Sequence, residues 1–246
     1  KSYVHRFPDR VKYIYQINKG PASARNLGIA RADGEYVAFL DADDVWLETR
    51  LETALQFMER HPECALTHAK TIRIKENGER LPEVQRNKAL LSGNIYEHIL
   101  LRKENISCLT VMVRKSVLDK VGTFDESPLC VAVEDRDMWL RIAKQYQILF
   151  IDEVLGFYRM RDGSISRDDW KAIDRKLYVI NKNCPKNSAL KNLAISRVYK
   201  ESADGMKYNG YAKEAKAYYK KALLHWPWNM YLWKNFIQCE WACVKS

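Results

Sequence analysis

The stretch that decides the fold runs from Asn18 to Asp44 and reads NKGPASARNLGIARADGEYVAFLDADD. Apolar residues from Ala22 to Arg31 have helical spacing, and the run from Tyr36 to Leu40 is continuously apolar, which is typical of a strand buried on both faces of a sheet. This strand ends at once in three carboxylates. A helix, a buried strand and an acidic strand end predict an α/β domain that binds its ligand at the carboxyl edge of the sheet.

The three carboxylates belong to Asp41, Asp43 and Asp44. Carboxylates this close repel one another unless a cation or a positive side chain lies among them. Oxygen ligands suit Mg²⁺ or Mn²⁺, which usually takes one or two protein carboxylates and leaves its other positions to phosphates and water. We therefore expect a divalent metal and a diphosphate at this edge of the sheet.

A helix cap and a calcium loop are the two alternatives for these carboxylates. Asp44 is predicted to cap a helix whose apolar residues recur from Trp46 to Met58, but a cap does not account for Asp41. A calcium loop does not fit, because Trp46 stands where such a loop needs glycine and Val45 replaces an oxygen ligand.

Strand-like and helix-like segments alternate from Lys1 to about Gly163, which predicts an α/β domain with a largely parallel sheet. The pattern VKYIYQI predicts a short strand over Val11–Ile17, and His61 with Pro62 ends the helix that follows Asp44. Further strands are expected at Ala65–Ile74, Cys108–Val113 and Ile148–Ile151, and further helices near Ser92–Leu101 and Asp135–Lys144.

Strand signals stop at about Asp168, and the rest of the chain has the pattern of successive amphipathic helices. We expect helices over roughly 168–183, 188–206, 211–225 and 229–243, and therefore divide the chain into residues 1–167 and residues 168–246. One 34-residue tetratricopeptide unit matches the spacing of some residues here, although a chance match explains so degenerate a pattern equally well. The matching residues are Ala203, Gly210, Ala215, Tyr219, Ala222 and Pro227.

The net charge of +10 is concentrated in the last third of the chain. Residues 165–246 hold 16 basic and 7 acidic side chains, against 25 and 24 in residues 1–164. A balanced body with a basic tail indicates docking to an anionic surface rather than nucleic-acid binding, and solvated lysines on helix faces are the alternative. The aromatic-rich end from Trp226 to Trp241 fits either a membrane interface or the core of the helical region.

Two further features bear on the class of protein. No apolar run approaches the roughly 18–20 residues that span a bilayer, and no basic-then-apolar leader opens the sequence, so we expect neither a membrane-spanning helix nor secretion. Six cysteines without a CxxC pair are too sparse for a disulfide scaffold and indicate a reducing, cytoplasmic location.

The stretch from Asn18 to Trp46 resembles the central signature of the family 2 inverting glycosyltransferases, NxGxxxARNxGxxxAxGeyxxFLDaDDxw. The resemblance continues, in the family's order, at VGTFDE (Val121–Glu126), EDRDMWLR (Glu134–Arg141) and YRMRDGS (Tyr158–Ser164), and it covers residues 1 to about 167. It implies a Rossmann-like nucleotide-diphosphosugar transferase (GT-A) fold, a divalent metal at the Asp-x-Asp motif, and transfer of a sugar to an acceptor hydroxyl with inversion.

The resemblance also implies roles for individual residues. Asp135 would be the catalytic base, and Glu134 beside it would orient the acceptor. Both carboxylates also suit the positive end of a helix, which is the structural alternative. The donor would be held by Arg25, Asp41, Arg159, Arg161 and Ser164, with the last three on the diphosphate, and the metal by Asp43 and Asp41. Ordinary surface positions are the alternative for the arginines.

One departure from the family's pattern concerns the start of the chain. Members of the family begin with a strand, a helix and a second strand that ends in a VDDGSTD-like sequence. Here Lys1–Phe7 already corresponds to the helix after that second strand. We therefore expect a GT-A fold that lacks its N-terminal βαβ unit, with an all-helical C-terminal appendage, and weakened recognition of the nucleotide base.

The expected function is transfer of a sugar from a nucleotide-diphosphosugar, with a uridine diphosphate donor expected from the resemblance alone. The acceptor would be a saccharide or lipid-linked saccharide in bacterial surface polysaccharide or glycoconjugate synthesis. The enzyme would be cytoplasmic, with peripheral contact to the inner face of the membrane through its basic helices, and would bind no nucleic acid. The alternative is a non-catalytic interaction protein that works through its helical tail.

Overall fold

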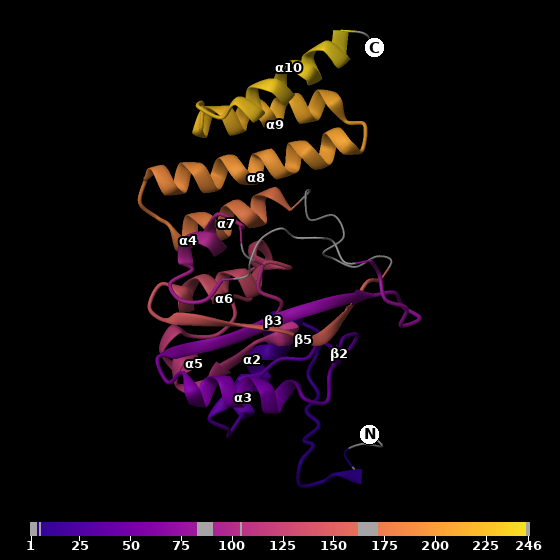
Figure 1. Cartoon of the computed structure of the whole chain (residues 1–246), viewed down its shortest axis with the longest axis vertical. Helices are drawn as coiled ribbons and strands as arrows, with labels where there is room; N and C mark the ends of the chain where they lie inside the picture. The colour runs from indigo at the N-terminus through magenta and orange to yellow at the C-terminus, as the bar shows by residue number, and fades with distance from the viewer. Residues whose placement is uncertain (1–3, 5, 83–90, 104, 162–171, 245–246) are drawn as a thin grey trace.

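The computed structural model describes residues 4, 6–82, 91–103, 105–161 and 172–244. Ser164, the beginning of the helix expected from residue 168, and part of the segment Lys1–Phe7 lie outside the described residues. Figure 1 shows a sheet with helices on both sides and a stack of helices above it.

The described strands form one five-stranded sheet in the order β1-β4-β3-β5-β2. β3 and β5 are parallel, while β4 runs antiparallel to both β1 and β3, and β2 runs antiparallel to β5. The expectation of a largely parallel sheet is therefore wrong, because β4 enters between two earlier strands in the opposite direction. The strands are β1 (Tyr36–Ala38), β2 (Val45–Trp46), β3 (Cys64–Ile74), β4 (Met112–Arg114) and β5 (Gln147–Arg159).

Helices cover the two faces of this sheet. α3 lies below it in Figure 1 and buries Ala54 and Met58 against apolar residues of β3, β4 and β5. α6 lies above it and contributes Met138, Trp139 and Leu140 to the main core. The helices of this body are α2 (Pro21–Arg31), α3 (Arg50–Arg60), α4 (Tyr96–Leu100), α5 (Lys115–Val121) and α6 (Glu134–Ala143).

The region after Asp44 differs from the prediction. Val45 and Trp46 are not helical but pair with Phe157 and Gly156 of β5, and α3 begins four residues later with Thr49 as its N-cap. Asp44 therefore caps no helix. Its carboxylate accepts a hydrogen bond from the backbone N–H of Arg159, 2.9 Å away.

The segment Val11–Ile17 is not a strand either. A strand needs a hydrogen-bonding neighbour, and none of the described strands pairs with this segment. Its aromatic and aliphatic side chains are largely exposed, with Tyr15 and Ile17 exposed by 78% and 74%. The alternation alone was insufficient to predict a strand.

Two more elements are shorter than expected. The segment predicted as a strand over Cys108–Val113 starts with a 3-10 turn at Cys108–Thr110 and becomes β4 only at Met112. The helix expected near Ser92–Leu101 is the short α4. In contrast, β5 continues to Arg159, well beyond the predicted Ile151.

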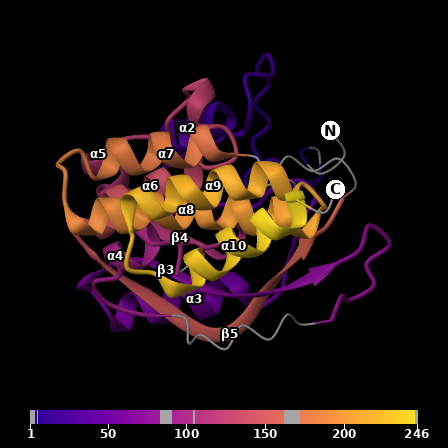
Figure 2. The same ribbon diagram turned by 90° about the horizontal axis from the view of Figure 1, so that it is seen from above.

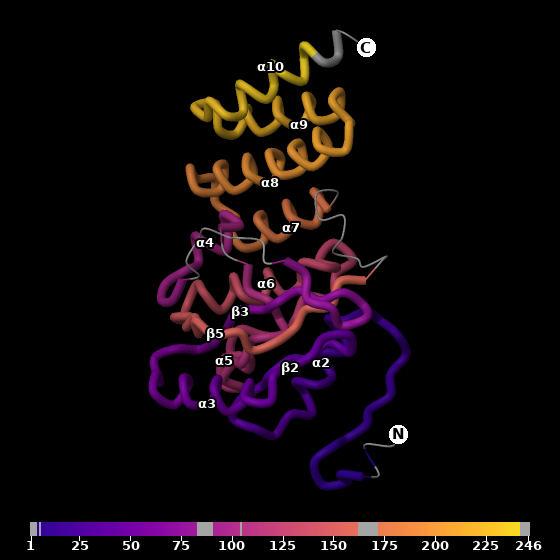
Figure 3. Tube along the Cα trace, turned by 45° about the vertical axis from the view of Figure 1, so that its right-hand side comes forward, coloured from indigo at the N-terminus to yellow at the C-terminus, as the bar shows by residue number. Residues whose placement is uncertain are grey.

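The C-terminal helices form a stack that leads away from the sheet, with α10 farthest from it (Figures 1 and 3). Seen from above, the stack lies over the body (Figure 2). None of the described helices is both long enough and apolar enough to cross a bilayer. The stack consists of α7 (Ile173–Asn183), α8 (Ala189–Tyr208), α9 (Ala212–His225) and α10 (Met230–Val244).

The stack does not have a core entirely of its own. Val179 and Ile180 of α7 and Val198 of α8 belong to the same buried apolar cluster as the helices on the upper face of the sheet. α8, α9 and α10 share a second, smaller cluster that includes Ala203, Tyr219 and other fully buried residues. The inner part of the stack is therefore packed continuously with the α/β body.

Candidate active site

Arg25 of α2 joins two acidic segments that are far apart in the sequence. Its Nη2 lies 2.8 and 2.9 Å from the two carboxylate oxygens of Asp41, and its Nη1 lies 2.8 Å from Oε1 of Glu134. The side chains of Arg25 and Glu134 are only 13% and 7% exposed. One guanidinium thus fixes the loop after β1 relative to the first turn of α6.

The charge of Arg25 is secured by its surroundings. Burial alone would lower its pKa, but the thiol of Cys108 and the carboxylates of Asp41 and Glu134 raise the pKa above its usual value. Arg25 is therefore a permanent cation that donates charge-assisted hydrogen bonds to two carboxylates.

The first turn of α6 holds Glu134 and Asp135. The second oxygen of Glu134, Oε2, is buried and has no hydrogen-bond partner among the described residues. Asp135 accepts a hydrogen bond from the backbone N–H of Arg136 at 2.6 Å. Burial and the neighbouring charge of Glu134 raise the pKa of Asp135 to about 6. A carboxyl group with a pKa this close to neutral is suited to exchange protons with a substrate.

The backbone just before α6 is in a rare conformation. Ala132 has a φ of 64°, in the left-handed region that favours glycine. Strain of this kind persists only where the surrounding structure holds it, and it is common beside functional residues. Here it lies two residues before Glu134.

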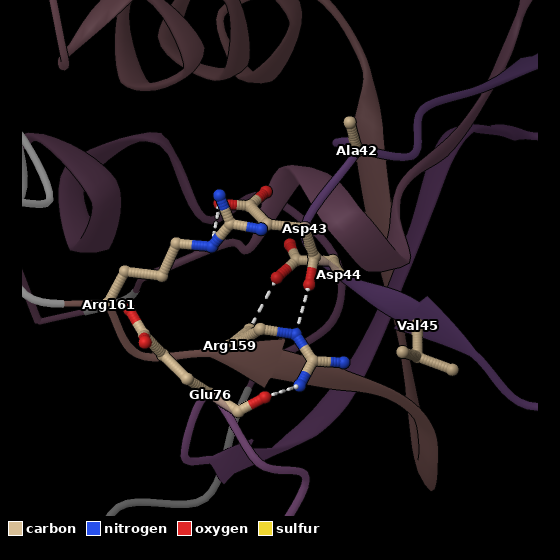
Figure 4. Close-up of a pocket in the computed structure, with 7 residues that line it drawn as sticks. All are labelled: Ala42, Asp43, Asp44, Val45, Glu76, Arg159 and Arg161. Carbon is tan, nitrogen blue, oxygen red and sulfur yellow. Dashed lines mark hydrogen bonds and ion pairs between the residues drawn. The ribbon is translucent and has the colours of Figure 1, made fainter.

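An open cavity of about 680 Å³ lies where β2 begins and β5 ends (Figure 4). Asp43 and Asp44 line it on one side, and Glu76, Arg159 and Arg161 on the other. The cavity thus combines carboxylates with guanidinium groups, and such a lining suits a metal-bound anion better than an apolar ligand.

The two arginines of the cavity have different surroundings. Arg159 lies at the end of β5, and its guanidinium donates to the backbone oxygens of Asp43 at 2.7 Å and Glu76 at 2.8 Å. Arg161 is half exposed, and its Nε lies 3.7 Å from a carboxylate oxygen of Asp43. Arg159 is therefore part of the wall, whereas Arg161 extends into solvent.

Negative charge is crowded on the acidic side of the cavity. The pKa of Asp44 is raised to about 6 by burial and by the nearby charges of Asp43 and Asp41, although its hydrogen bond from Arg159 opposes the shift. The ligand atoms of these three residues do not converge on one point. In the described parts of the chain, the one group of three ligand atoms within 4.8 Å belongs to Asp125, Cys130 and Asp137.

Sequence reasoning identified the acidic residues of the site but missed some of their supports. Arg50 is fully buried, lies 4.8 Å over the ring of Trp46, and donates to the backbone oxygen of Val111 at 2.6 Å. Burial lowers its pKa to about 10. It packs beneath the strand that follows Asp44. A lone arginine in a helical pattern gives no signal of this role.

Asn26, next to Arg25, is a second support that sequence reasoning did not identify. Its side chain donates to the backbone oxygen of Phe124 at 2.9 Å and accepts from the backbone N–H of Phe124 at 2.8 Å. This pair of bonds ties α2 to the segment Val121–Glu126. The two segments that these bonds join, Asn18–Trp46 and Val121–Glu126, both belong to the family's pattern, and this was the signal available in the sequence.

Comparisons with known proteins identify glycosyltransferases as relatives of this chain. A family model described as "Glycosyl transferase family 2" matches residues 1–122. The putative teichuronic acid biosynthesis glycosyltransferase TuaG of Bacillus subtilis is 31% identical over 176 residues, which are 71% of this chain and 66% of that protein. An uncharacterized glycosyltransferase of Rickettsia conorii is 33% identical over 63% of this chain and 24% of its own length.

Solved structures with the same fold are also known. TarS 1–349 of S. aureus, in complex with UDP-GlcNAc, has a TM-score of 0.57 and 17% identity, over 91% of this chain and 68% of that one. The mannosyltransferase PcManGT of Pyrobaculum calidifontis, in complex with GDP-Man and Mn²⁺, has a TM-score of 0.53 and 12% identity, over 97% and 71%. The expected GT-A-like α/β fold with a helical C-terminal region is confirmed.

The chain spans about a quarter of the length of the first curated relatives that it matches. The family model covers the segment that contains Arg25, Asp41 and Asp43, and it ends before Glu134. The chain belongs to glycosyl transferase family 2 and has a GT-A-like α/β fold with a helical C-terminal region.

Proposed function

We propose that the protein catalyses metal-dependent transfer of a sugar, with inversion, from a nucleotide-diphosphosugar to an acceptor hydroxyl. The observation that supports this best is the bridge from Asp41 through Arg25 to Glu134. It joins the acidic strand end, where a donor would bind, to the first turn of α6, where the acceptor would react.

The proposed donor is a uridine diphosphate sugar, bound in the cavity between Asp43 and Arg161. Structures of related fold hold UDP-GlcNAc and GDP-Man, so a nucleotide sugar is the supported class, and uridine is the choice to test first. Arg161 has donors for phosphate oxygens, and Arg159 supports the wall beside it. Ser164 is proposed as a further diphosphate contact from the segment after Arg161.

The proposed acceptor is a saccharide or lipid-linked saccharide of a bacterial surface polymer. Relatives of this chain are named for such polymers: TuaG for teichuronic acid and GgaB for minor teichoic acid in Bacillus subtilis, and AmsE for amylovoran in Erwinia amylovora. The acceptor hydroxyl would lie between Oε2 of Glu134, which has no hydrogen-bond partner among the described residues, and the carboxylate of Asp135.

A divalent ion, Mn²⁺ or Mg²⁺, fits the acidic side of the cavity. Asp43 has a carboxylate that is 39% exposed and faces one guanidinium at 3.7 Å, so its oxygens are accessible to a cation. Burial, together with the nearby negative charges of Asp43 and Asp41, raises the pKa of Asp44. Asp43 would hold the ion, with Asp41 as the second proposed ligand while it also pairs with Arg25. The ion would neutralise charge on the leaving diphosphate.

The reaction would proceed as one in-line displacement. The acceptor oxygen attacks the anomeric carbon while the bond from that carbon to the diphosphate oxygen breaks, and this single displacement inverts the configuration. Asp135 takes the proton of the acceptor hydroxyl, and its pKa of about 6 leaves it largely ionised at neutral pH. The nucleoside diphosphate leaves with the bonding electrons, and Arg161 stabilises its charge.

The test is release of nucleoside diphosphate by the full chain from a panel of nucleotide sugars, with Mn²⁺ or with EDTA. We expect metal-dependent turnover with one donor, and losses of about 100-fold or more for Asp43→Ala and Asp135→Asn. Arg31→Ala, at the exposed end of α2, is the control. Unchanged turnover in both aspartate variants would contradict the assignment of their roles.

We further propose that residues 1–167 are the catalytic domain and that residues 168–246 are a helical region containing one tetratricopeptide-like unit. Support for the unit is the full burial of its small residues Ala203, Ala215 and Ala222, and Tyr219 is fully buried in the same cluster. Tyr219 also donates to Asp204 at 2.6 Å. Small residues at these positions allow the two helices to approach closely.

The end of this helical region is proposed to contact the anionic inner face of the membrane. Trp228, Met230 and Trp241 are exposed by 85%, 84% and 67%, and Trp233 and Ile237 lie on the same side of α10. Indole and aliphatic side chains favour headgroup depth, and lysines beside them attract anionic lipid. The exposed lysines nearby are Lys213, Lys220, Lys221 and Lys234.

Vesicle co-sedimentation tests this contact. We expect binding to phosphatidylglycerol vesicles that falls with added salt and is lost in Trp233→Ala/Trp241→Ala, and little binding to phosphatidylcholine. Equal binding of wild type and variant, or none by the wild type, would contradict it.

A further inference from the structure

A polar network connects α7 of the helical region to α6, the helix that begins with Glu134 and Asp135. Its centre is the fully buried carboxylate of Asp137. One oxygen of this carboxylate accepts from Asn183 Nδ2 at 2.8 Å, and the other accepts from Lys182 Nζ at 2.9 Å and from Arg141 Nε at 3.0 Å. Two residues of α7 therefore hold one carboxylate of α6.

Lys182 holds a second carboxylate at the same time. Its Nζ lies 2.8 Å from Oδ2 of Asp125, which also accepts from the hydroxyl of Tyr178 at 2.9 Å. Asp125 follows Phe124, which is tied to Asn26 of α2. The ammonium of Lys182 thus connects α7, α6 and the segment Val121–Glu126 in one place.

The same group has the composition of a metal site, because Asp125, Cys130 and Asp137 offer ligand atoms within 4.8 Å of one another. The position of a cation between the two carboxylates is, however, taken by the ammonium of Lys182. Burial and the nearby carboxylates raise the pKa of Cys130 to about 12, so it remains a thiol rather than a metal-binding thiolate. A lysine, not a metal, is the cation of this cluster.

The charges of the cluster balance. Asp125 and Asp137 carry two negative charges, and Lys182 and Arg141 carry two positive ones. Loss of Lys182 would leave a buried carboxylate without full compensation, and such unpaired charge is expensive. The position of the first turn of α6 would change, because Asp137 lies about one turn after Glu134 and less than one turn after Asp135.

We propose that Lys182 is a positioning residue for glycosyl transfer: its bonds to Asp125 and Asp137 set the placement of α6, and with it the placement of Glu134 and Asp135 against Arg25 and the acceptor. The inference rests on the proposed function and extends it, because it makes the first helix after the α/β body part of the catalytic arrangement. Tyr178 and Asn183 support the same contact from α7.

The test compares Lys182→Met with Lys216→Met in the full chain. The two lysines are matched: their side chains are 33% and 32% exposed, and each forms an ion pair of 2.8 Å, Lys182 with Asp125 and Lys216 with Glu240. We expect kcat to fall about 10- to 100-fold in Lys182→Met with the donor KM within about twofold, because the carboxylates are displaced while the donor cavity is intact. Lys216→Met is expected to match the wild type.

Two further variants separate positioning from loss of folding. Lys182→Arg keeps the charge and both hydrogen bonds, and is expected to restore kcat to within about threefold of the wild type. Asp125→Asn/Lys182→Met removes one charge of each sign, so the remaining pair of Asp137 and Arg141 is balanced and the protein is expected to fold. The bonds of Lys182 to both carboxylates are still lost, and kcat is expected to stay low.

Amide hydrogen exchange provides a readout that does not depend on turnover. We expect faster exchange at residues 134–143 in Lys182→Met than in Lys216→Met. Wild-type kcat in folded Lys182→Met, unchanged exchange in α6, or equal losses in kcat, KM and stability that Lys182→Arg does not reverse would each overturn the inference. A wild type that releases no nucleoside diphosphate from any donor would instead overturn the proposed function, while the exchange result would still decide whether Lys182 positions α6.

Discussion

At the scale of single residues, Asp135 shows how a reactive carboxylate costs stability. Its pKa is about 6 in the folded protein, against an ordinary value of 3.8, so the folded state binds the proton more tightly than the unfolded chain. The free energy of unfolding therefore falls as the pH rises from about 4 through about 6, and the full cost is present at neutral pH.

Asp135→Asn removes this cost. We expect the variant to be more stable than the wild type by about 1–2 kcal/mol at pH 7, a value reduced from the full linkage because the side chain is partly exposed. The difference should vanish at about pH 3, where the carboxyl is protonated in the folded wild type and largely protonated in the unfolded chain. Urea denaturation of both proteins at the two pH values measures it, and a variant less stable at pH 7 would show that the carboxylate has a stabilising contact instead.

Arg25 is the residue on which both halves of the site depend. Its guanidinium reaches Asp41 and Glu134 from different nitrogen atoms, whereas the single nitrogen of lysine cannot span the same two carboxylates. We expect Arg25→Lys to lower kcat/KM about 100-fold, and Arg31→Lys in the last turn of the same helix to leave it unchanged. Steady-state kinetics on the donor that the panel identifies make the comparison, and comparable rates for the two variants would contradict the bridging role.

At the scale of elements, the two arginines at the end of β5 are expected to have different roles: one supports the wall of the cavity, and the other binds the donor. Arg159 satisfies backbone oxygens of Asp43, Lys75 and Glu76, while Arg161 is half exposed beside Asp43. Arg159→Met is therefore expected to lower the free energy of unfolding by about 1–3 kcal/mol and to impair donor binding. Arg161→Met should raise the donor KM about tenfold without changing stability.

Thermal unfolding and donor titration of these two variants give the check. Because the residues are two positions apart and chemically identical, each is the control for the other. A loss of stability in Arg161→Met, or wild-type stability in Arg159→Met, would show that the division between wall and ligand contact is wrong.

The elements that sequence reasoning predicted well are those whose burial is uniform. α2, β3 and α6 lie within a residue or two of their expected ranges, because one face of each helix, or most of the strand, is apolar. The prediction for the segment after Asp44 was wrong, because Val45 and Trp46 fit a helical pattern equally well and only their pairing with β5 makes them a strand. The direction of each strand could not be predicted from the local sequence pattern either, because it depends on which strand lies beside it in the sheet.

The site shows the same division. Charged residues in a recurring motif could be predicted from the sequence, and the structure brings Arg25, Asp41 and Glu134 into direct contact. The role of Arg159 in the wall of the cavity could not be predicted from the sequence. Its partners are backbone oxygens, which every residue has, so no residue type indicates the contact. Lys182 was equally hidden, since its two carboxylates are 45 and 57 residues away.

At the scale of the whole molecule, the composition suggests a boundary near residue 167 that the packing crosses. Val179 and Ile180 of α7 and Val198 of α8 are buried in the same cluster as Trp139 and Leu140 of α6. Burial of these apolar side chains couples the inner helices to the α/β body, because separating the two would expose both apolar surfaces to water at a cost in free energy. The polar contacts of Lys182 and Asn183 lie beside this apolar contact and give it a defined register.

A substitution on α7 should therefore weaken the whole protein rather than one part. Ile180 is 3% exposed, and we expect Ile180→Ala to lower the free energy of unfolding by about 2–4 kcal/mol, with a single transition. Leu224→Ala, at a position 75% exposed on α9, is the control and should have little effect. Urea unfolding followed by circular dichroism and by amide exchange in β3 and α7 measures both. If exchange in α7 becomes faster while β3 stays protected, the helices unfold independently, and the position of α6 cannot depend on Lys182 as inferred.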